Sequence, residues 1–486
     1  MRFEGKQIKI FLENKKINYY NIKMFDLFEK VNVHSNLKIK IEIDKETKKE
    51  FEEIIEKENS NLIVKIQTDK DVENEIFNGI IDYFEILHYG NDGYEVYLEI
   101  FSKSIMLDRK LEKKYRVFQD TSWTYEKIID EINKEYKDKK INVIASEVCK
   151  KSIENIKIQF DETDWDFLKR LASELQTHIF ATSKGIITIG LIENNNEIKE
   201  EKYFCNYSIV RNMKNKYYKI FSESNINLAD NVLIDGINTG LNVIESNIYL
   251  KNNILKSEAI IADLTRYYVE RKYNEKIVGN RIEVKVERVF EENNIAKMEV
   301  MFYEGLKNLV ESSEDFNQKY RAYVDYGLKR FAFSYQTFYS QTNTGFFCTP
   351  EINDTVEIYF PNKDEKMAKI SWAINNKGNG RFSDYEKRNF HINGKDFNFK
   401  IEKDSMEMNL AKSYRRNSKS SVEEAESFVN KSTKNLVVVS DDYIGIESIG
   451  DMSVYGESLE IIGKKKDIKI ETPGEIRIKG KKVHNN

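Results

Sequence analysis

An apolar pair recurs every eight residues near the end of the chain, and this register constrains the fold more than any other feature. Glycine, serine and threonine keep a fixed phase with the pairs, so each unit reads as a strand of about five residues and a corner of about three. In one unit Glu460 replaces the first apolar member, and we expect a slip or kink there. The members of the register are Leu436, Val438, Ile444, Ile446, Met452, Val454, Ile462, Ile468, Ile470, Ile476 and Ile478.

A strand with one narrow apolar face cannot enclose that face by itself. Three chains wound about a common axis can do so, because each supplies one wall of a triangular prism with the apolar pairs inside. The register therefore predicts a trimeric, triple-stranded β-helix over 436–486, with rungs spaced about 4.8 Å apart and a length of roughly 30 Å. The alternative is a surface meander of short hairpins, which would need Asn-Gly turns and would not keep one phase over so many units.

The chain reads as mostly β up to about residue 120. Alternation at period two predicts a sheet with one buried face, and "NDG" at 91–93 predicts a hairpin turn. Apolar and polar residues alternate, strictly or loosely, over 38–43, 62–68, 76–87 and 93–102.

Three later segments have helical spacing. An apolar stripe runs through 122–136 and another through 160–175, where Thr163 is the expected N-cap with Asp166 three residues on. The segment 257–274 also reads as a helix, after further strands up to about residue 250. We therefore expect a first domain over 1–278 that is mainly β with a few helices.

A new β unit begins at Gly279 with a hairpin around "EENN". Five or so strands within 279–375 fit a small barrel. The segment 376–435 reads as a polar linker followed by short strands at 397–401 and 406–410. A capping box predicts a short helix over 420–431, which would be marginal in water without packing.

Composition excludes several classes. Lysine and arginine number 77 against 81 acidic residues, a net charge of −4, which argues against a dedicated nucleic-acid binder. We expect no signal peptide and no membrane span, since no apolar run has the needed length. Cys149, Cys205 and Cys348 are odd in number and far apart, so neither a disulfide framework nor a zinc site is indicated. Synthesis in a reducing cytoplasm is expected.

Two motifs carry a family resemblance. Residues 158–180 read "IQFDETDWDFLKRLASELQTHIF", and residues 344–375 read "TGFFCTPEINDTVEIYFPNKDEKMAKISWAIN". The first is similar to the motif Q-x-x-E-T-D-x-D-F-x-x-R-L of VgrG-like hub-and-spike proteins of contractile injection systems. The second is similar to that family's G-W-x-x-x-P-E-x-G-D-x-V segment. The candidate site residues are Phe160, Glu162, Thr163, Asp164, Trp165, Asp166, Phe167, Leu168 and Arg170 in the first motif, and Gly345, Phe346, Pro350, Glu351, Asp354 and Val356 in the second.

Weaker matches support the same resemblance. The segment 77–86 is similar to a family strand F-x-G-x-V, and 106–123 to a segment ending in R-x-F-Q-x-x-S. In the 228–235 segment Ala229 stands where the family's G-D-x-V turn has glycine, and in the second motif Asn353 does the same. Asparagine can take the left-handed conformation that such a turn needs.

The resemblance implies a homotrimer in three functional parts. Residues 1–278 would be an α+β hub of β-barrels that adapts a hexameric tail tube to a threefold spike. Residues 279–375 would be a barrel of the oligonucleotide/oligosaccharide-binding type, 376–435 a linker, and 436–486 the membrane-piercing needle. The implied partners are the tail tube protein, other baseplate proteins, the tape-measure protein, a PAAR-type tip protein and the target cell envelope.

Sharper chemical hypotheses compete with structural ones. The carboxylates of Asp161, Glu162 and Asp164 could form a general acid/base pair. Helix capping, and the favourable interaction of negative charge with the N-terminal end of the helix dipole, explain them more simply. Aromatic residues of the predicted barrel could stack on the bases of single-stranded nucleic acid. However, side chains alternate between the two faces of a strand, so about half of these residues are expected to face the core. We expect no nucleic-acid partner and no cofactor. His484 could place three imidazoles on a trimer axis and hold a tip metal, although a single histidine departs from the family's paired pattern.

We therefore expect a structural, non-enzymatic hub and spike, assembled into a tail or baseplate particle. The leading alternative is a tail-associated peptidoglycan hydrolase, against which the short 376–435 segment and the missing Cys–His motif argue. A secreted trimeric adhesin is a third possibility. Residues 461–482 carry eight Lys/Arg and three Asp/Glu. This excess could attract anionic cell surfaces, or simply keep β edges soluble.

Overall fold

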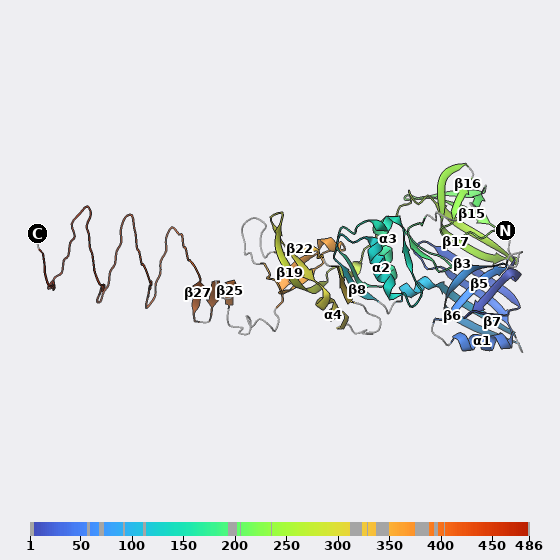
Figure 1. The fold of residues 1–486 in the computed structure, drawn as a ribbon, viewed down its shortest axis with the longest axis horizontal. Coiled ribbons are helices and arrows are strands. Elements are labelled where there is room, and N and C mark those ends of the chain that lie inside the picture. The colour runs from blue at the N-terminus through green and yellow to red at the C-terminus, as the bar shows by residue number, and fades with distance from the viewer. Residues whose placement is uncertain are drawn as a thin grey trace. The chain divides into compact units, whose positions relative to one another are not determined.

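The protein is mainly β, with four α-helices among the residues that its computed structural model describes. It divides into two compact units, an N-terminal unit of residues 1–387 and a C-terminal unit of residues 388–486. Figure 1 labels the elements. The described residues are 4–55, 59–67, 72–90, 93–109, 113–192, 202–204, 206–234, 236–311, 323–327, 329–336, 349–374, 388–392, 397–402 and 404–484.

A 13-stranded sheet dominates the N-terminal unit. Its two halves, from residues 8–102 and 202–262, join where β17 (Ile237–Lys251) pairs with β3 (Asn21–Lys30) in antiparallel register. β13 (Lys202–Phe204) and β16 (Asn231–Ile234) lie off the main path and reach it through β17. The strand order on that path is β14 (Tyr207–Arg211), β15 (Lys216–Ser222), β18 (Ile254–Ala262), β17 (Ile237–Lys251), β3 (Asn21–Lys30), β4 (Asn36–Ile43), β7 (Gly93–Ser102), β6 (Glu73–Tyr89), β5 (Asn61–Gln67), β1 (Ile8–Leu12) and β2 (Lys15–Lys16).

The alternation seen in the sequence explains the first half of this sheet. In β4 and β7 every second residue is buried, so each strand turns one face to the core. β4, β5, β6 and β7 confirm the strands predicted near 38–43, 62–68, 76–87 and 93–102. The sequence reading missed α1 (Lys45–Ile55), which places Phe51 in that core. Its start is marked by Asp44, whose side chain accepts a hydrogen bond from the Thr47 amide at 2.7 Å.

Two helices and two small sheets form the next layer. α2 (Tyr125–Glu135) and α3 (Asp164–Glu174) confirm the helices predicted over 122–136 and 160–175, and they share one apolar core. One small sheet has the order β10 (Lys157–Glu162), β8 (Lys114–Phe118), β21 (Tyr323–Tyr326). The other has the order β11 (Ile179–Ala181), β12 (Ile187–Ile189), β9 (Val143–Ala145).

The helix predicted over 257–274 is wrong. Residues 254–262 form β18, which is bonded to β15 on one side and β17 on the other, and no helix follows before the short 3-10 turn Glu275–Ile277. Leu255, Ser257, Ala259 and Ile261 alternate into the core, a period-two pattern that the apolar run concealed. Pairing on both edges therefore outweighs helical propensity here.

A five-stranded antiparallel sheet follows, with α4 (Tyr303–Glu311) packed on β19. The hairpin predicted around "EENN" is confirmed, because Glu292 pairs with Ile295 and both asparagines between them have positive φ. The predicted barrel is not closed by a continuous ladder among the described residues, although one bridge joins Tyr335 to Ile370. The sheet order is β22 (Ala332–Ser334), β20 (Ile295–Met301), β19 (Arg281–Glu292), β23 (Thr355–Tyr359), β24 (Lys369–Ala373).

The C-terminal unit begins with an antiparallel meander of β25 (Arg388–Ile392), β26 (Phe397–Ile401) and β27 (Met406–Leu410). β26 and β27 confirm the two short strands expected there. Residues 411–484 contain no helix or strand, all are exposed, and Figure 1 draws them as a trace with repeated turns. The helix predicted over 420–431 is therefore wrong, as a short polar helix has too little to pack on. The triple-stranded β-helix is likewise not formed within this one chain.

Candidate functional site

The diagnostic motif of the sequence lies where β10 turns into α3. β10 pairs with β8, and the ladder shifts register between Phe160 and Glu162. At this bulge Asp161 takes a φ of 49°, which re-aims the chain into the helix. Thr163 is the N-cap as predicted, since its hydroxyl accepts a hydrogen bond from the Asp166 amide at 3.2 Å.

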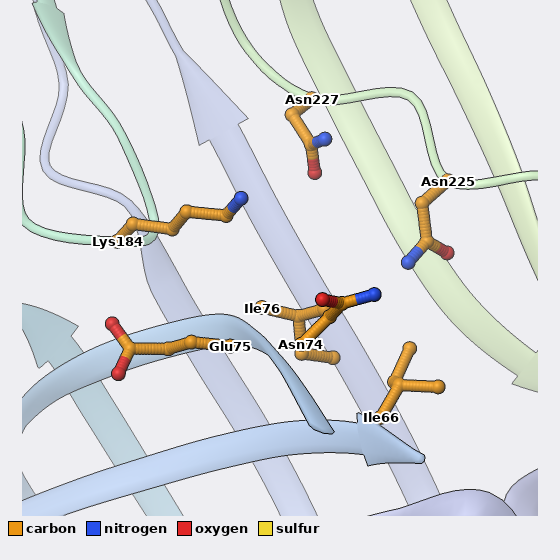
Figure 2. A pocket seen from close by; sticks show the side chains of 7 residues that line it. All are labelled: Ile66, Asn74, Glu75, Ile76, Lys184, Asn225 and Asn227. Carbon is orange, nitrogen blue, oxygen red and sulfur yellow. The ribbon is translucent and has the colours of Figure 1, made fainter. Parts of the chain in front are cut away.

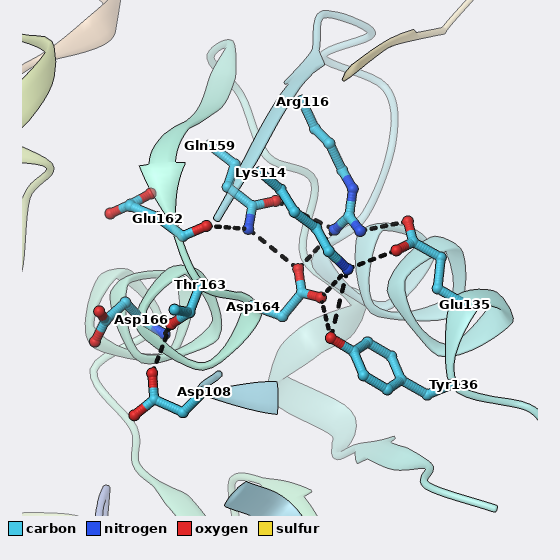
Figure 3. A network of polar contacts seen from close by, with 10 residues as sticks. All are labelled: Asp108, Lys114, Arg116, Glu135, Tyr136, Gln159, Glu162, Thr163, Asp164 and Asp166. Atoms are coloured by element: carbon cyan, nitrogen blue, oxygen red, sulfur yellow. Dashed lines mark hydrogen bonds and ion pairs between the residues drawn. The ribbon is translucent and has the colours of Figure 1, made fainter. Parts of the chain in front are cut away.

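Asp164, the first residue of α3, is the centre of a buried polar cluster (Figure 3). Its side chain is fully buried, and its two oxygens accept from four donors. Lys114 Nζ and Tyr136 Oη lie 2.5 and 2.6 Å from Oδ2, while Arg116 Nη1 and Gln159 Nε2 lie 2.7 and 3.1 Å from Oδ1. Every acceptor position of the carboxylate is therefore occupied.

Both cations of the cluster have a second carboxylate partner. Lys114 Nζ lies 2.5 Å from Glu135 Oε2, and Arg116 also bonds the other Glu135 oxygen. Lys114 and Arg116 come from β8, in which all five residues are buried. We call Lys114, Arg116, Glu135, Tyr136, Gln159 and Asp164 the Asp164 cluster; it joins β8, β10, α2 and α3.

The electrostatics of the cluster fix the charge of its central carboxylate. Burial alone would raise the pKa of Asp164, but the charges of Arg116 and Lys114 outweigh it and lower that pKa to about 2. The pKa of Arg116 is raised: burial works against its charge, but Asp164 and Glu135 overcome that effect. Asp164 is therefore ionised at neutral pH and enclosed by donors, which makes it a structural anchor.

Arg170 builds a second buried ionic group from the other side of α3. Its Nε and Nη2 bond the two oxygens of Glu162 at 3.1 and 2.9 Å, and Nη2 also donates to the Ile158 carbonyl at 2.6 Å. Its Nη1 lies 2.7 Å from Oε1 of Glu365, which belongs to the short turn Glu365–Met367 between β23 and β24. One guanidinium thus links the helical layer to the five-stranded sheet.

The two carboxylates that share Arg170 differ from Asp164. Burial raises the pKa of Glu162 and of Glu365, and the nearby Arg170 charge offsets this only in part. Arg170 is the one cation bonded to two carboxylates here, whereas Lys114 and Arg116 together face the two carboxylates of Asp164 and Glu135. The ratio of charges explains why the shifts run in opposite directions.

The remaining motif residues pack around these charges. Trp165 lies against the ring of His34 with centroids 4.0 Å apart, and Phe167 stacks on Phe118. Burial lowers the pKa of His34, and Asp108 bonds both that imidazole and the Thr163 hydroxyl. Phe160 and Leu168 are buried as well, whereas Asp166 is exposed. The motif therefore builds a joint between layers, and the acid/base alternative has no support in this geometry.

The second predicted motif forms a turn before β23. Asn353 has a φ of 75°, as expected for a residue standing in for glycine, and its amide donates to the Val286 carbonyl at 2.8 Å. The Asp354 side chain accepts from the Glu351 amide at 2.9 Å. Pro350 and Val356 are buried, while Gly345 and Phe346 lie outside the described residues. The turn fixes where β23 joins β19.

Every member of the apolar register is exposed to water in the single chain. Its members are between 49% exposed at Ile444 and 77% exposed at Ile446. His484 is exposed too, and no group of three or more potential metal-ligating residues occurs in the described part of the chain. The structure thus brings the hub motif together within one chain but does not bring the register together.

A shallow pocket of about 360 Å³ opens beside β5 and β6 (Figure 2). Lys184 and Asn227 extend into it from loops, and Asn74 and Glu75 line it from β6. Its polar groups are three amides and one ion of each sign, which suits hydrogen bonding. No helix in the described ranges is long and apolar enough to cross a membrane.

Sequence reasoning missed the partners of the motif. Lys114, Arg116, Glu135 and Tyr136 lie up to about 50 positions before Asp164, and Glu365 lies 195 positions after Arg170. A signal did exist for Lys114 and Arg116: two cations alternate within the apolar segment "KYRVF", where a buried strand requires them to be paired. Glu365 carries no comparable signal.

Comparison with known protein families gives a match over part of the chain. Residues 37–183 match the phage tail baseplate hub (GPD) family, a range that contains the whole Asp164 cluster. The resemblance inferred from the motifs is therefore confirmed for this part of the chain. A comparison with curated proteins gave no match.

Solved structures extend the likeness beyond the family match. The lidded Francisella PdpA–VgrG complex contains a chain with a TM-score of 0.50 and 9% identity, over 82% of this chain and 76% of that one. The half-lidded form gives a TM-score of 0.50 and 10% identity, over 82% and 83%. The E. coli c3393 protein, a component of the type VI secretion system, has a TM-score of 0.49 and 11% identity, over 76% and 100%. At these identities the Francisella chains show a shared fold.

Proposed function

We propose that three copies of this chain form the hub and spike of a contractile injection machine, since residues 37–183 match the phage tail baseplate hub (GPD) family. The family match supports a role for the chain in a phage-tail-like baseplate. The trimer, the spike and the piercing role are the parts that we add. The fold shared with chains of the Francisella PdpA–VgrG complex supports this choice.

The observation that carries the proposal is the periodic, exposed apolar face of the C-terminal unit. Backbone bends recur every eight residues, at Thr433, Asp441, Ile449, Glu457, Lys465, Pro473 and Lys481. The apolar pairs fall between these bends, so each straight segment presents its pair at the same place in the repeat. Two further copies would cover the pairs and supply the missing strand partners.

In this proposal each residue class has a mechanical role. The pairs from Leu436 to Ile478 point to the trimer axis, and the lysines Lys464 to Lys466 lie outside. A rod of this kind resists bending, because every rung is shared among three chains and few strand edges stay open. Contraction of a sheath would drive such a rod through the target cell envelope.

The N-terminal unit would hold the rod to the tail. Its large sheet would form the ring that meets the tail tube, other baseplate proteins and the tape-measure protein. The five-stranded sheet would close into a barrel as a collar, for which the Tyr335–Ile370 bridge gives support. A PAAR-type tip protein would cap the end near His484, and a tip metal there remains a subsidiary proposal. The role is mechanical, with no catalytic step.

Mass in solution tests the proposal. Light scattering of the purified full chain should give three times the mass of one chain, and a chain ending at residue 435 should lose part of that association. A monomer under native conditions would sink the trimer. A zymogram on purified cell wall should show no clearing, and clearing would favour the hydrolase alternative instead.

A further inference from the structure

The small sheet at the start of the C-terminal unit has one apolar face. Phe390 pairs with Phe399, which pairs in turn with Met408, and Ile401 pairs with Met406. Residues directly opposite in an antiparallel ladder point to the same side. The rings of Phe390 and Phe399 lie 6.2 Å apart, as this requires. Phenylalanine, isoleucine and methionine thus share one surface.

The opposite face of the same sheet is polar. Lys400 pairs with Glu407 across β26 and β27. Asn409 donates from its side-chain amide to Glu407 at 2.8 Å, which places both on this side, and Lys400 also forms an ion pair with Glu402. The sheet is therefore two-faced, and β27 alternates strictly between the faces.

The apolar face is open to water in the single chain. Met406 is 71% exposed, Met408 47%, Ile401 38% and Leu410 36%. A lone three-stranded sheet needs packing on its apolar face to be stable, so this surface requires a cover. A candidate cover must present an apolar area of similar size.

The sheet runs without interruption into the repeating turns. β27 ends at Leu410, and the first bends follow at residues 411 and 412, with further ones at 419 and 426. Counting back in steps of eight from Leu436 and Val438 reaches Phe428, Val422 and Tyr414, so each upstream unit keeps one apolar member. Because eight is an even number, residues eight positions apart in an extended chain point to the same side. Met406, Met408 and Leu410 have even numbers, as all members of the register do.

We propose that the apolar face of β25–β27 is a trimerisation surface, on which three copies of this sheet enclose a common core at the head of the spike. The inference rests on the proposed trimer, because the same two further copies that cover the register also reach this sheet. Three identical faces about a threefold axis close on themselves and leave no apolar face open. The structure thus assigns residues 388–435, expected from the sequence to be a linker, to the spike.

Methionine oxidation of the purified full chain tests this without any mutation. Met213 at 107% and Met367 at 44% exposure set the fast end of the scale, and Met298 at 0% sets the slow end. Met406 and Met408 should form sulfoxide at least about tenfold more slowly than Met213 despite their exposure in the single chain. Mass spectrometry of peptides from a peroxide time course measures each rate.

Met452, which belongs to the register and is 61% exposed in the single chain, separates the two proposals. Slow oxidation of Met406, Met408 and Met452 in a trimer supports both. If Met452 oxidises slowly while Met406 and Met408 oxidise fast, the trimerisation surface on β25–β27 is rejected and the proposed spike is still supported. Fast oxidation of all three overturns both. If Met406 and Met408 oxidise slowly but Met452 oxidises fast, the trimerisation surface on β25–β27 is supported and the inward-facing register is rejected. If Met406 and Met408 oxidise slowly in a protein that is a monomer, the trimerisation surface is rejected.

A matched pair of variants gives a second test in the full chain. Met408→Asp would bring three carboxylates together in an apolar core, whereas Asn409→Asp adds the same charge to the polar face one residue away. We expect Met408→Asp to lower the dissociation temperature of the trimer sharply and Asn409→Asp to leave it within a few degrees. Equal behaviour of the two variants would overturn the inference.

Discussion

The Asp164 cluster buries a charged side chain, whereas the C-terminal repeat exposes apolar side chains. Asp164 is a charged residue with a fully buried side chain, and every atom that it needs for pairing comes from the same chain. Ile478 is an apolar residue that stays 75% exposed among the described residues of its own chain. The charged side chain of the N-terminal unit is therefore paired within one chain, whereas the apolar side chain of the C-terminal unit stays exposed in the single chain. Under the proposed function, two further copies of the chain would cover it.

This contrast has a thermodynamic reason. A buried charge without partners would cost several kcal/mol, so a chain that buries one must supply the partners from its own sequence. An exposed isoleucine loses only the stabilisation that burial would give, about 2 kcal/mol, and that gain can wait for assembly. Subunits with a preformed hub and an unsatisfied spike would fold first and assemble afterwards.

The largest expected effect comes from a charge in the register. Ile470→Asp should abolish assembly of the spike, since three unpaired carboxylates would meet on the trimer axis. Lys469→Asp adds the same carboxylate one residue earlier, on the outer side, and should leave the trimer intact. Resistance to SDS on gels and mass by light scattering measure both. Normal trimers of Ile470→Asp would show that the pair does not face inward and would erase the contrast between the two regions.

The second effect lies in the N-terminal unit. Asp164→Asn keeps the volume but leaves Lys114 and Arg116 buried beside a neutral amide, and should lower the free energy of unfolding by about 3 to 5 kcal/mol. Asp166→Asn, at the exposed position two residues on, should change it by less than about 0.5 kcal/mol. Denaturant unfolding of the full chain measures both. Similar values for the two variants would mean that the cluster does not anchor this unit.

Acid provides a third and smaller test of the same carboxylate. The pKa of Asp164 is lowered to about 2 from an ordinary 3.8, so its charge stabilises the fold above pH 3.8. This contribution, about 2 kcal/mol, is lost as the pH falls from 3.8 through 2. The stability gap between the wild type and Asp164→Asn should therefore be flat from pH 7 to 5 and shrink below pH 4. A gap that stays constant down to pH 2 would contradict the depressed pKa.

Local and periodic signals are enough to predict much of the fold. Thr163 marks the start of α3 from the amino-acid sequence alone, because capping depends only on neighbours along the chain. The hairpin at Asn293 and Asn294 is visible for the same reason. The register from Leu436 to Ile478 predicts partner chains through its period alone, and this stays a prediction; in the single chain its side chains are exposed.

Features set by distant contacts are not predictable in the same way. Glu365 bonds Arg170 across 195 positions, and nothing near Glu365 indicates a buried acid. Residues 257–274 have a sequence typical of a helix, because the strands that pair with β18 on both sides, β15 and β17, lie outside this segment of the sequence. The helix expected at 420–431 fails for the opposite reason: its capping box is real in sequence, but the exposed chain offers it nothing to pack on.

The smallest effect concerns Ala229, in the 228–235 segment whose sequence is similar to a G-D-x-V motif. Ala229 has a φ of 68°, its amide donates to the Val243 carbonyl at 3.0 Å, and the motif has glycine there. The left-handed conformation costs alanine about 1 to 2 kcal/mol, and glycine escapes this while losing somewhat more entropy on folding. Ala229→Gly should therefore raise the free energy of unfolding by up to about 1 kcal/mol.

Ala259→Gly is the matched control for this last prediction. Ala259 is a buried residue of β18 whose backbone is not in the left-handed region, so the same change should lower the free energy of unfolding by about 1 kcal/mol. Opposite shifts in the denaturant midpoint would show that the N-terminal unit tolerates strain at Ala229 because the surrounding hydrogen bonds hold that turn. Shifts of the same sign would mean that residue 229 carries no strain, and that the alanine there fits the turn as well as glycine does.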